Sequence, residues 1–485
     1  MTAAYFLGID IGTQGARVVL IDEKGNMIAE EEERFPLTGE SREEQSTSDW
    51  WQSCLCSLQK LILKAKDLAD LKQIQAISAT STSGTVIPLD IHNKPLHNAI
   101  MYSDKRSDAE GILCREMALK YNNSGYTGFN SSSGLSKMVW FVNQFPDKAT
   151  RIHKWIHATD YIIGMLSGKW AITDFTNVLK SGYDLERNEW PEYLYKNLPL
   201  QKEWLPEVVP SGTPVGILNA ALAIQLGLKE NILVIAGMTD GCASQMASGA
   251  VNPGDWNTTI GTTLVVKGVT QQKIKDPEDS LYNHRHPQGY WMPGGASNIG
   301  ADWVTKDFKS DLAILNEQAS KLIPTGKIAY PLRQQGERFP FVALHAQGFE
   351  TEQMSDAERF AANMEGVAYI ERYAYEKIEK LSGEKVKAVY TAGGASNSDV
   401  WLTIRSNVLN LPVYKMKHVT GAFGAAVIAA STTHFTGIIQ AAKALIQIEK
   451  EVHPQKDLAE AYNKDYYRFL QALQEKGYIK KEAYA

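Results

Sequence analysis

The chain has 485 residues, of which 44% are hydrophobic and 22% charged, a composition typical of a globular protein with more than one domain. The formal net charge of −5 makes nucleic acid and an anionic membrane surface poor partners. The four cysteines include no CxxC pair, and no apolar run reaches the roughly 18 to 20 residues of a membrane span. We therefore expect a cytoplasmic metabolic enzyme with reduced thiols and without nucleic-acid or membrane partners.

A β-hairpin is the first predicted element. Residues 5–11 are apolar and rich in β-formers, Gly12 to Gly15 make a turn, and residues 17–22 form a second strand. The glycines suggest a phosphate-binding loop, but a Rossmann or P-loop site requires a helix after them and a different spacing. The segment therefore predicts two strands joined by a turn.

Asp10 places a negative charge within this hairpin. A carboxylate next to phosphate is repelled unless a cation lies between them, and Mg²⁺ is commonly held by one or two carboxylates plus phosphate oxygens. We therefore interpret Asp10 as a metal-facing carboxylate, with Thr13, Gln14 and the turn amides on phosphate and Arg17 as a neutralising charge. The alternative is an aspartate that caps the turn with its own side chain.

Helical and strand patterns alternate after the hairpin. The pattern predicts a helix over 49–65 with Ser48 as its N-cap, a strand, loop and strand over 74–90, and helices through 137–145 and 160–168. Asp104 and Arg106 lie in the polar stretch that follows the two strands, where by themselves they indicate a solvated pair.

A second acidic candidate, Asp240, follows a buried apolar strand over 232–236 and precedes a glycine and a helical stretch. Ligands of α/β sheets bind at such strand ends, and a carboxylate there could accept the proton of an attacking hydroxyl. An N-cap for the following helix is the alternative.

Residues 256–269 repeat the strand–turn–strand pattern of residues 6–22, which suggests two related domains, although GT turns between strands also occur by coincidence. A third glycine cluster follows the strand over 388–391, with a helix from near Asp399, and suits an anion or the phosphate–ribose part of a nucleotide. The small residues over 420–430 predict a helix able to pack against a flat ring.

Seven of these segments, in order, resemble the FGGY carbohydrate kinases: GIDIGTQGAR, EQSTSDWW, MYSDKRSD, AGMTDGCA, TTIGTTLVV, AGGASNSDVWLTIRSNVLNLPV and GAFGAAVIAA. The resemblance implies an α/β fold of two actin-like (ribonuclease H-like) domains of the hexokinase–actin–heat-shock ATPase superfamily around a central cleft. Residues 1–248 would bind the sugar and carry the catalytic base, and residues 249–485 would bind ATP. The implied activity is ATP-dependent, Mg²⁺-assisted phosphorylation of a sugar hydroxyl.

The resemblance also implies roles for particular residues. Asp240 matches the family's general base and Asp10 its metal-proximal carboxylate. The two phosphate hairpins match Thr13 and the turn of Gly261, Thr262 and Thr263. The adenosine motif matches Gly393, Gly394, Ala395 and Asn397, and the sugar-contact region is occupied by Ser81, Thr82, Ser83, Tyr102 and Asp104.

Two departures from the family bear on the substrate. The xylulokinase-like members carry a histidine in a QMHG-type run where this chain has Ser83 in STSG, and the segment GERFPFVALHAQGF follows the family only loosely. We therefore expect a five-carbon ketose, D-ribulose first and D-xylulose second, with a polyol such as ribitol or glycerol as the alternative. A catalytically silent sugar or nucleotide sensor on the same fold is the rival function. Family members are often homodimers, although no segment here shows a clear interface pattern.

Overall fold

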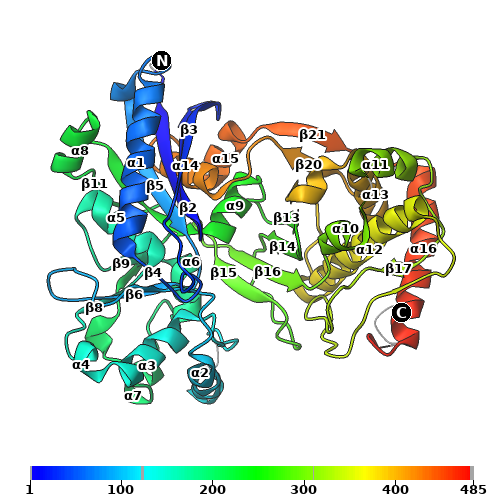
Figure 1. Ribbon diagram of the computed structural model, residues 1–485, viewed down its shortest axis with the longest axis horizontal. Helices are drawn as coiled ribbons and strands as arrows, with labels where there is room; N and C mark the ends of the chain where they lie inside the picture. Colours follow the sequence, from blue (N-terminus) through cyan, green and yellow to red (C-terminus); the bar gives the residue numbers. More distant parts are fainter. Residues whose placement is uncertain (1–2, 122–124, 310, 481–485) are drawn as a thin grey trace. The chain divides into compact units, whose positions relative to one another are not determined.

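The structure, a computed structural model, describes residues 3–121, 125–309 and 311–480 (Figure 1). It divides into two compact units. The first unit comprises the chain up to Ala247 together with His284–Gly289 and His418–Ile446, and the second comprises Ser248–Asn283, Tyr290–Lys417 and the chain from Gln447 onward. No helix in the described ranges combines the length and the apolar character that crossing a bilayer requires.

The first unit is built on a six-stranded sheet in the order β11–β12–β5–β1–β2–β3. The strands β1 and β2 form the predicted antiparallel hairpin, while β1, β5 and β12 run parallel. The turn of the hairpin is closed by the N–H of Gly12, which donates to the carbonyl of Gly15 at 3.0 Å. The bounds are β1 (Tyr5–Ile11), β2 (Gly15–Asp22), β3 (Met27–Arg34), β5 (Ile74–Ser81), β11 (Pro214–Ile217) and β12 (Leu233–Thr239).

Helices and two small sheets complete this unit. The helices are α1 (Thr47–Ala65), α2 (Asp108–Tyr121), α3 (Gly134–Gln144), α4 (Pro146–Ala149), α5 (Ala158–Ser167), α6 (Phe175–Val178), α7 (Tyr193–Lys196), α8 (Ala220–Leu226), α9 (Asp240–Ala247), α14 (Gly421–Ser431) and α15 (Ile438–Leu445). The small sheets are β4 (Glu44–Gln45), β7 (Ala99–Ile100), β6 (Val86–Leu89) and β8 (Lys154–His157), and β9 (Ile172–Asp174) with β10 (Glu207–Val209).

The second unit repeats the strand pairing of the first. Along β16–β14–β13–β19–β20–β21 the pairs are antiparallel, antiparallel, parallel, parallel and antiparallel, as they are along β3–β2–β1–β5–β12–β11. The predicted echo between two hairpins is therefore part of a larger repeat. The bounds are β13 (Asp255–Ile260), β14 (Leu264–Gly268), β15 (Tyr282–Arg285), β16 (Trp291–Ser297), β19 (Ala388–Ala392), β20 (Val413–Met416) and β21 (Ile448–Val452).

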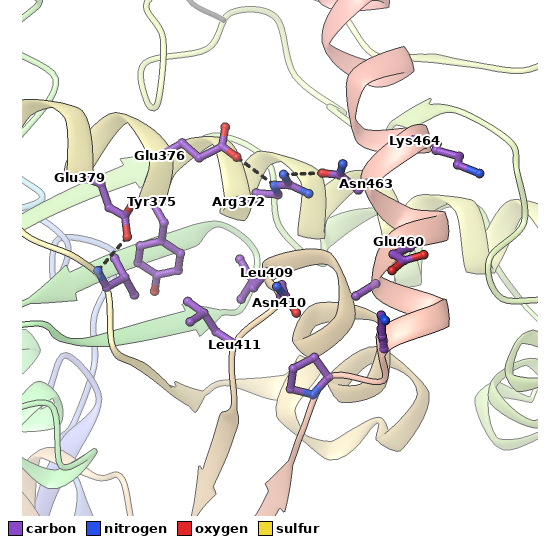
Figure 2. A pocket seen from close by; sticks show the side chains of 14 residues that line it. Arg372, Tyr375, Glu376, Glu379, Leu409, Asn410, Leu411, Glu460, Asn463 and Lys464 are labelled. Carbon is purple, nitrogen blue, oxygen red and sulfur yellow. Dashed lines mark hydrogen bonds and ion pairs between the residues drawn. The ribbon is translucent and has the colours of Figure 1, made fainter.

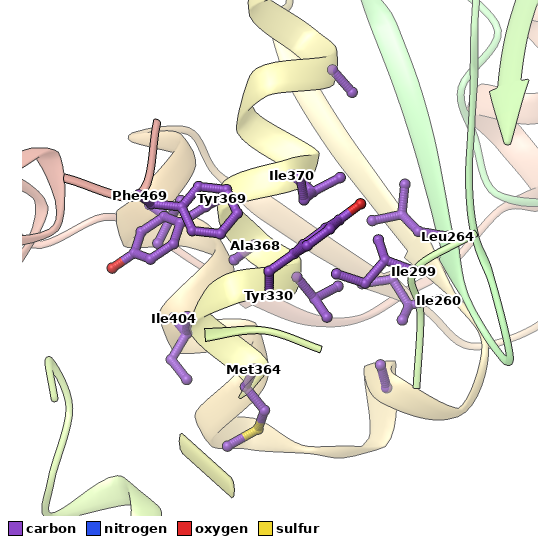
Figure 3. Packing of buried hydrophobic residues seen from close by; sticks show 14 of the residues in the cluster. Ile260, Leu264, Ile299, Tyr330, Met364, Ala368, Tyr369, Ile370, Ile404 and Phe469 are labelled. Atoms are coloured by element: carbon purple, nitrogen blue, oxygen red, sulfur yellow. The ribbon is translucent and has the colours of Figure 1, made fainter. Parts of the chain in front are cut away.

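Helix α12 forms the centre of the second unit's core. Its N-cap Ser355 and Glu358 make a capping box, Gly383 ends it in a left-handed conformation, and every residue from Phe360 to Glu371 is buried. Figure 3 shows its residues packed with Tyr330 and Phe469. The remaining elements are α10 (Asp302–Asp307), α11 (Leu312–Ser320), α12 (Asp356–Ser382), α13 (Asp399–Leu409), α16 (Lys456–Glu475), β17 (Ala329–Tyr330) and β18 (Phe349–Glu350).

The sequence-based expectations differ from the structure at two helices. Helix α1 is capped by Ser46, whose hydroxyl accepts from the N–H of Asp49 at 3.2 Å, and not by Ser48. Helix α14 packs with the first unit, whereas it was expected within the ATP-binding domain of residues 249–485. It contacts β1, β5 and α9, and all its residues are buried, so the small-residue face expected to meet a flat ring packs on protein instead.

Candidate active site

Two of the predicted carboxylates lie at one edge of the first unit's sheet. In the parallel strands, Asp10 of β1 is level with Thr80 of β5, and Thr80 is level with Met238 of β12. Asp240 follows β12 directly, as the first residue of α9. Because parallel strands end at a common edge, the fold brings both carboxylates to the carboxyl end of the sheet, where ligands of α/β proteins bind.

The environment of Asp10 disfavours the charged form of its carboxyl group. Burial, and next the negative charge of Asp240, raise the pKa of Asp10 to about 7, although the charge of Arg17 partly opposes the shift. Arg17 faces Asp10 across the hairpin, but its guanidinium is bound by Glu32 at 2.6 Å and lies 3.4 Å from Glu30. The predicted neutralising charge is therefore already shared with two other carboxylates.

The hydrogen bonding of Asp10 separates the two interpretations of this residue. Its Oδ1 is buried and has no hydrogen-bond partner among the described residues, and the adjacent turn is closed by backbone atoms of Gly12 and Gly15. A turn-capping side chain would accept a backbone N–H. A buried carboxylate oxygen without a donor, close to a second carboxylate, instead suits a bound cation such as Mg²⁺.

Hydrogen bonds from β5 and α6 hold the backbone around Asp240. The hydroxyl of Thr80 donates to the carbonyl of Met238 at 2.7 Å, and the N–H of Thr239 donates to the hydroxyl of Thr176 at 2.8 Å. Asp240 Oδ1 accepts from the N–H of Gly241 at 2.6 Å. No loop separates the strand from the helix, because α9 begins immediately after β12.

In the predicted sugar-contact run at residues 81–84, some hydroxyls are bonded within the protein and one is not. Ser81 donates to the carbonyl of Ile11 at 2.9 Å, and the hydroxyls of Thr82 and Thr85 are 2.8 Å apart. Ser83 differs, because its buried Oγ has no partner among the described residues. Gly84 adopts φ +85°, and a Cβ there would lie 2.3 Å from the carbonyl oxygen of Ser132. Of this run, Ser83 has the hydroxyl without a partner among the described residues.

Tyr102 and Asp104 follow β7 with different exposures. Tyr102 is 38% exposed, and its N–H donates to the hydroxyl of Thr85 at 3.1 Å. Asp104 is only 1% exposed, so the solvated pair expected with Arg106 is wrong. Arg106 Nε donates to both carboxylate oxygens at 3.0 Å, its Nη2 donates to Oδ2 at 2.8 Å, and the same Nη2 reaches Glu44 at 2.7 Å.

Lys137 and Trp140 add further contacts to the pair of Asp104 and Arg106. The buried amine of Lys137 donates to the carbonyl of Asp104 at 3.1 Å and to that of Ser131, and burial lowers the pKa of Lys137 to about 8. The guanidinium of Arg106 also lies over the ring of Trp140, 4.4 Å from its centre. Both carboxylate oxygens of Asp104 are thus bonded to Arg106, within the loop that carries Tyr102.

The turn of the first hairpin is held by a residue that the sequence analysis missed. Gln45 donates to the carbonyl of Thr13 at 3.0 Å, and its own Oε1 accepts from the indole of Trp50 at 2.8 Å. The side chain of Gln14 is exposed. The signal was present in the sequence, because Gln45 belongs to the EQSTSDWW segment that precedes α1.

In the second unit, two glycine turns meet at the corresponding sheet edge. The turn after β13 is closed by the N–H of Gly261, which donates to the carbonyl of Thr263 at 3.1 Å, and Thr262 is exposed. Gly393 adopts φ +88°, and a Cβ there would lie 2.5 Å from the carbonyl oxygen of Ile260. The predicted adenosine turn therefore requires glycine in order to approach the end of β13.

The rest of this turn is partly open. Nothing lies within 4 Å of a Cβ built on Gly394, Asn397 is exposed, and Ala395 is buried. Ser398 caps α13 by accepting from the N–H of Trp401 at 3.2 Å. Exposed backbone before a helix N-terminus is suited to a phosphate or ribose group.

A buried polar network supports both turns from below. Arg405 and Glu371 form a fully buried ion pair, and Arg405 also bonds Thr391 on β19. Thr391 donates to the carbonyl of Thr258 on β13 at 3.2 Å, which ties the two strands together next to their turns. The sequence analysis missed these residues, because a buried arginine on a predicted helix resembles a surface one until its partner is known.

The loosely matching segment after Gly336 has a clear structural role. Glu337 is buried and accepts from the hydroxyl of Ser297 at 2.8 Å, the N–H of Asn298 at 2.7 Å and the hydroxyl of Tyr330 at 2.9 Å. Burial raises its pKa, and these donors partly oppose the shift. Glu337 thus connects this segment to the end of β16.

An open pocket elsewhere in the second unit contains none of the predicted site residues. It has a volume of about 820 Å³ and lies between α12, the end of α13 and the start of α16 (Figure 2). Its lining residue Arg372 is held by Glu376 at 2.9 Å and by Asn463 at 2.8 Å. In the described ranges, no cluster of three or more His, Cys, Asp or Glu side chains could hold a metal ion.

Comparisons with known proteins agree with this architecture. The N-terminal domain of the FGGY family of carbohydrate kinases matches residues 5–247, and its C-terminal domain matches residues 256–433. The chain is 25% identical to a xylulose kinase of Staphylococcus epidermidis, over 98% of this chain and 97% of the other. It is 26% identical to a gluconokinase of Bacillus licheniformis, over 84% of each.

A solved structure gives the same fold. The crystal structure of a xylulose kinase from Brucella ovis superposes with a TM-score of 0.87 at 23% identity, covering 97% of this chain and 99% of that one. The fold and the two matched domains together define an α/β sugar kinase. The chain belongs to the FGGY family of carbohydrate kinases and is an ATP-dependent sugar kinase.

Proposed function

We propose that the protein transfers the γ-phosphoryl group of ATP to a hydroxyl of a five-carbon ketose, with Asp240 as the general base. The observation that carries the proposal is the pairing of Asp10 and Asp240 at the carboxyl end of one parallel sheet, where the charge of one raises the pKa of the other. One carboxylate would accept the proton of the attacking hydroxyl, and the other would face a cation.

The different roles proposed for Asp10 and Asp240 follow from the surroundings of each residue. The unpartnered Oδ1 of Asp10 suits Mg²⁺, which would supply the positive charge that lets a carboxylate and phosphate groups lie near each other. Asp240 removes the hydroxyl proton, and its rigidly bonded strand end keeps the carboxylate oriented. The turns at Thr13–Gln14 and Gly261–Thr263 bind phosphate through their amides, and Gly393, Gly394, Ala395 and Asn397 bind the nucleoside part of ATP.

The proposed substrate is a neutral sugar. A sugar acid such as gluconate would require a free cation for its carboxylate, but Arg106 is already bonded to Asp104 and Glu44. Ser83, with its unpartnered hydroxyl, suits a sugar hydroxyl instead. Several of the relatives are xylulose kinases, which favours D-xylulose, whereas the small hydroxyl-bearing run at 81–84 favours D-ribulose. These two ketoses differ in configuration at a single carbon.

The test is ADP release from Mg·ATP with D-xylulose, D-ribulose, L-xylulose, L-ribulose, ribitol, glycerol, gluconate or no sugar. Strong stimulation by one ketopentose is expected. Stimulation by gluconate or a polyol alone would overturn the substrate class, and ADP release unaffected by every sugar would overturn the kinase assignment in favour of a sensor. Homodimer formation is a separate proposal, to be tested by light scattering of the purified protein.

The same assay tests the base. Asp240→Asn is expected to lower kcat by on the order of 10²- to 10⁴-fold while sugar binding is largely kept, because the carboxylate acts mainly in the transition state. Asp67→Asn, at an exposed position on the same unit, is the matched control. Turnover of Asp240→Asn at the wild-type rate would contradict the assignment.

A further inference from the structure

The first residue of α14 lies against the carboxylate of Asp10. A Cβ placed on Gly421 would lie 2.7 Å from Asp10 Oδ2, 2.9 Å from Asp10 Cγ and 3.1 Å from Thr80 Cγ2. Real Cβ atoms essentially never lie within 3.0 Å of another heavy atom, so any side chain at position 421 must displace the Asp10 carboxylate or the helix. Gly421 and Asp10 are more than 400 residues apart in the chain and belong to the same compact unit.

Backbone conformation does not account for this glycine. The φ of Gly421 lies outside the left-handed region, and the preceding Thr420 provides a regular N-cap by accepting from the N–H of Phe423 at 3.2 Å. Glycine is less favourable than alanine in such a helix position. The space occupied by the Asp10 carboxylate is therefore the structural reason for a glycine here.

Close packing of α14 against α9 opposes a shift of the helix away from Asp10. A Cβ on Gly8 of β1 would lie 2.0 Å from the carbonyl oxygen of Ala422, and one on Gly424 would lie 2.0 Å from that of Ala243 in α9. The helix is thus in backbone contact with a strand on one side and a helix on the other, and all its residues are buried. The Asp10 side chain, which can rotate, would have to move instead.

We propose that Gly421 is a positioning residue, which holds the Asp10 carboxylate in the orientation that presents it to Mg²⁺·ATP. The inference rests on the proposed role of Asp10. It also gives α14 a function at the site: the chain returns to the first unit to close the space behind the metal-facing carboxylate.

The experiment compares Gly421→Ala with Gly424→Ala. Both put a methyl group into a tight contact of the same helix, but only the first contact involves Asp10. Gly421→Ala is expected to raise the Mg²⁺ concentration needed for half-maximal ADP release by about tenfold or more and to weaken Mn²⁺ binding by the ADP-bound enzyme, measured by electron paramagnetic resonance. Gly424→Ala is expected to lower Tm without either effect. Equal metal dependence in the two variants would overturn the inference.

A double-mutant cycle provides the second readout. Asp10→Ala removes the carboxylate that a methyl group at 421 would meet, so adding Gly421→Ala to it should change neither metal binding nor Tm further. Additive effects would overturn the inference. If Gly421→Ala alone fails to fold, recovery of folding in the double variant supports the contact, and failure of both contradicts it. Wild-type metal dependence of Asp10→Ala would instead overturn the proposed role of Asp10 itself.

Discussion

At the scale of single residues, the loop of the candidate sugar site is ordered by contacts among its own side chains. Asp104 has both carboxylate oxygens on Arg106, which in turn is anchored by Glu44 and lies over Trp140. Such an arrangement orders a loop through charge-assisted bonds that a lysine cannot reproduce, because only the guanidinium presents a planar fork to a carboxylate. We therefore assign Arg106 to positioning the loop of Tyr102.

Replacing Arg106 with lysine tests that assignment. The substitution keeps the charge but loses the two-point contact with Asp104, and charged hydrogen bonds contribute about 1.5–3 kcal/mol each. The KM for the sugar is expected to rise roughly 10- to 100-fold, with a smaller change in the KM for ATP. Steady-state kinetics with each substrate varied in turn make the measurement, and Arg115→Lys on the exposed face of α2 is the control. An equal rise in both KM values would indicate general misfolding.

Some of these residue roles could be predicted from the sequence and others could not. Asp10 and Asp240 were identified because a carboxylate next to a glycine turn, or at the end of a buried strand, is chemically unusual. Gly421 was missed, because its partner Asp10 is remote in sequence and a glycine at the start of a helix is ordinary by itself. The burial of Asp104 was missed for a different reason. Its pairing with Arg106 was expected in solvent, and Lys137, which donates to the carbonyl of Asp104, is recognised as a neighbour only from the fold.

At the scale of elements, α12 carries a second buried carboxylate that has no part in the proposed chemistry. Glu365 is fully buried and accepts from the N–H of Thr325 at 2.9 Å and from the hydroxyl of Tyr462 at 3.1 Å. Burial raises its pKa from 4.5 to about 7 in spite of these donors. The helix is thereby joined to the segment before β17 and to α16 through a group that prefers to stay protonated.

The raised pKa of Glu365 makes the free energy of unfolding depend on pH. Between about pH 4.5 and pH 7 the folded state keeps the Glu365 proton that the unfolded chain has released, so the free energy of unfolding falls as the pH rises through that window. In Glu365→Gln that contribution is removed, and the wild-type curve should fall relative to the variant by on the order of a few kcal/mol. Urea unfolding at several pH values measures it, with the exposed Glu352→Gln as the control. Parallel curves would contradict the prediction.

Elements with strong local signals were predicted well. The hairpins of β1–β2 and β13–β14 and the strand before Gly393 were identified from apolar runs bounded by glycine turns. The start of α1 was misplaced by two residues, because Ser46 and Ser48 are both suitable N-caps and their hydroxyls bond each other at 2.8 Å. The location of α14 was not predictable, since a helix of small residues suits any close packing partner equally well.

At the scale of the whole molecule, the two sheets share one pattern with different chemistry at the same place. The first hairpin reads Asp10, Ile11, Gly12, Thr13 where the second reads Thr259, Ile260, Gly261, Thr262. The strand pairings around both are identical in order and direction, as expected for a duplicated domain. Thr259, in the position of Asp10, donates to Asn257 within its own strand at 3.1 Å. One hairpin thus carries a carboxylate at this position, while the other carries a threonine that is bonded within its own strand.

The return of residues 418–446 to the first unit makes a prediction about how that unit folds. Helix α14 covers one face of β1 and β5, and Gly8 of β1 lets the helix backbone approach the strand closely. Gly424 of α14 allows the same close approach to α9. A fragment of residues 1–247 would leave this face exposed, and a hydrophobic sheet face without its helix does not give a stable domain.

We therefore expect residues 1–247 alone to bind the dye ANS and to lack a cooperative unfolding transition. The same fragment joined through a flexible glycine–serine linker to residues 418–446 should show one, because α14 and α15 again cover the sheet and α9. Joining residues 447–475 by the same linker is the control, since α16 packs within the second unit. If the 1–247 fragment unfolds cooperatively without the added segment, α14 contributes little to the stability of this unit, and its close fit against β1 would then serve the Asp10 site alone.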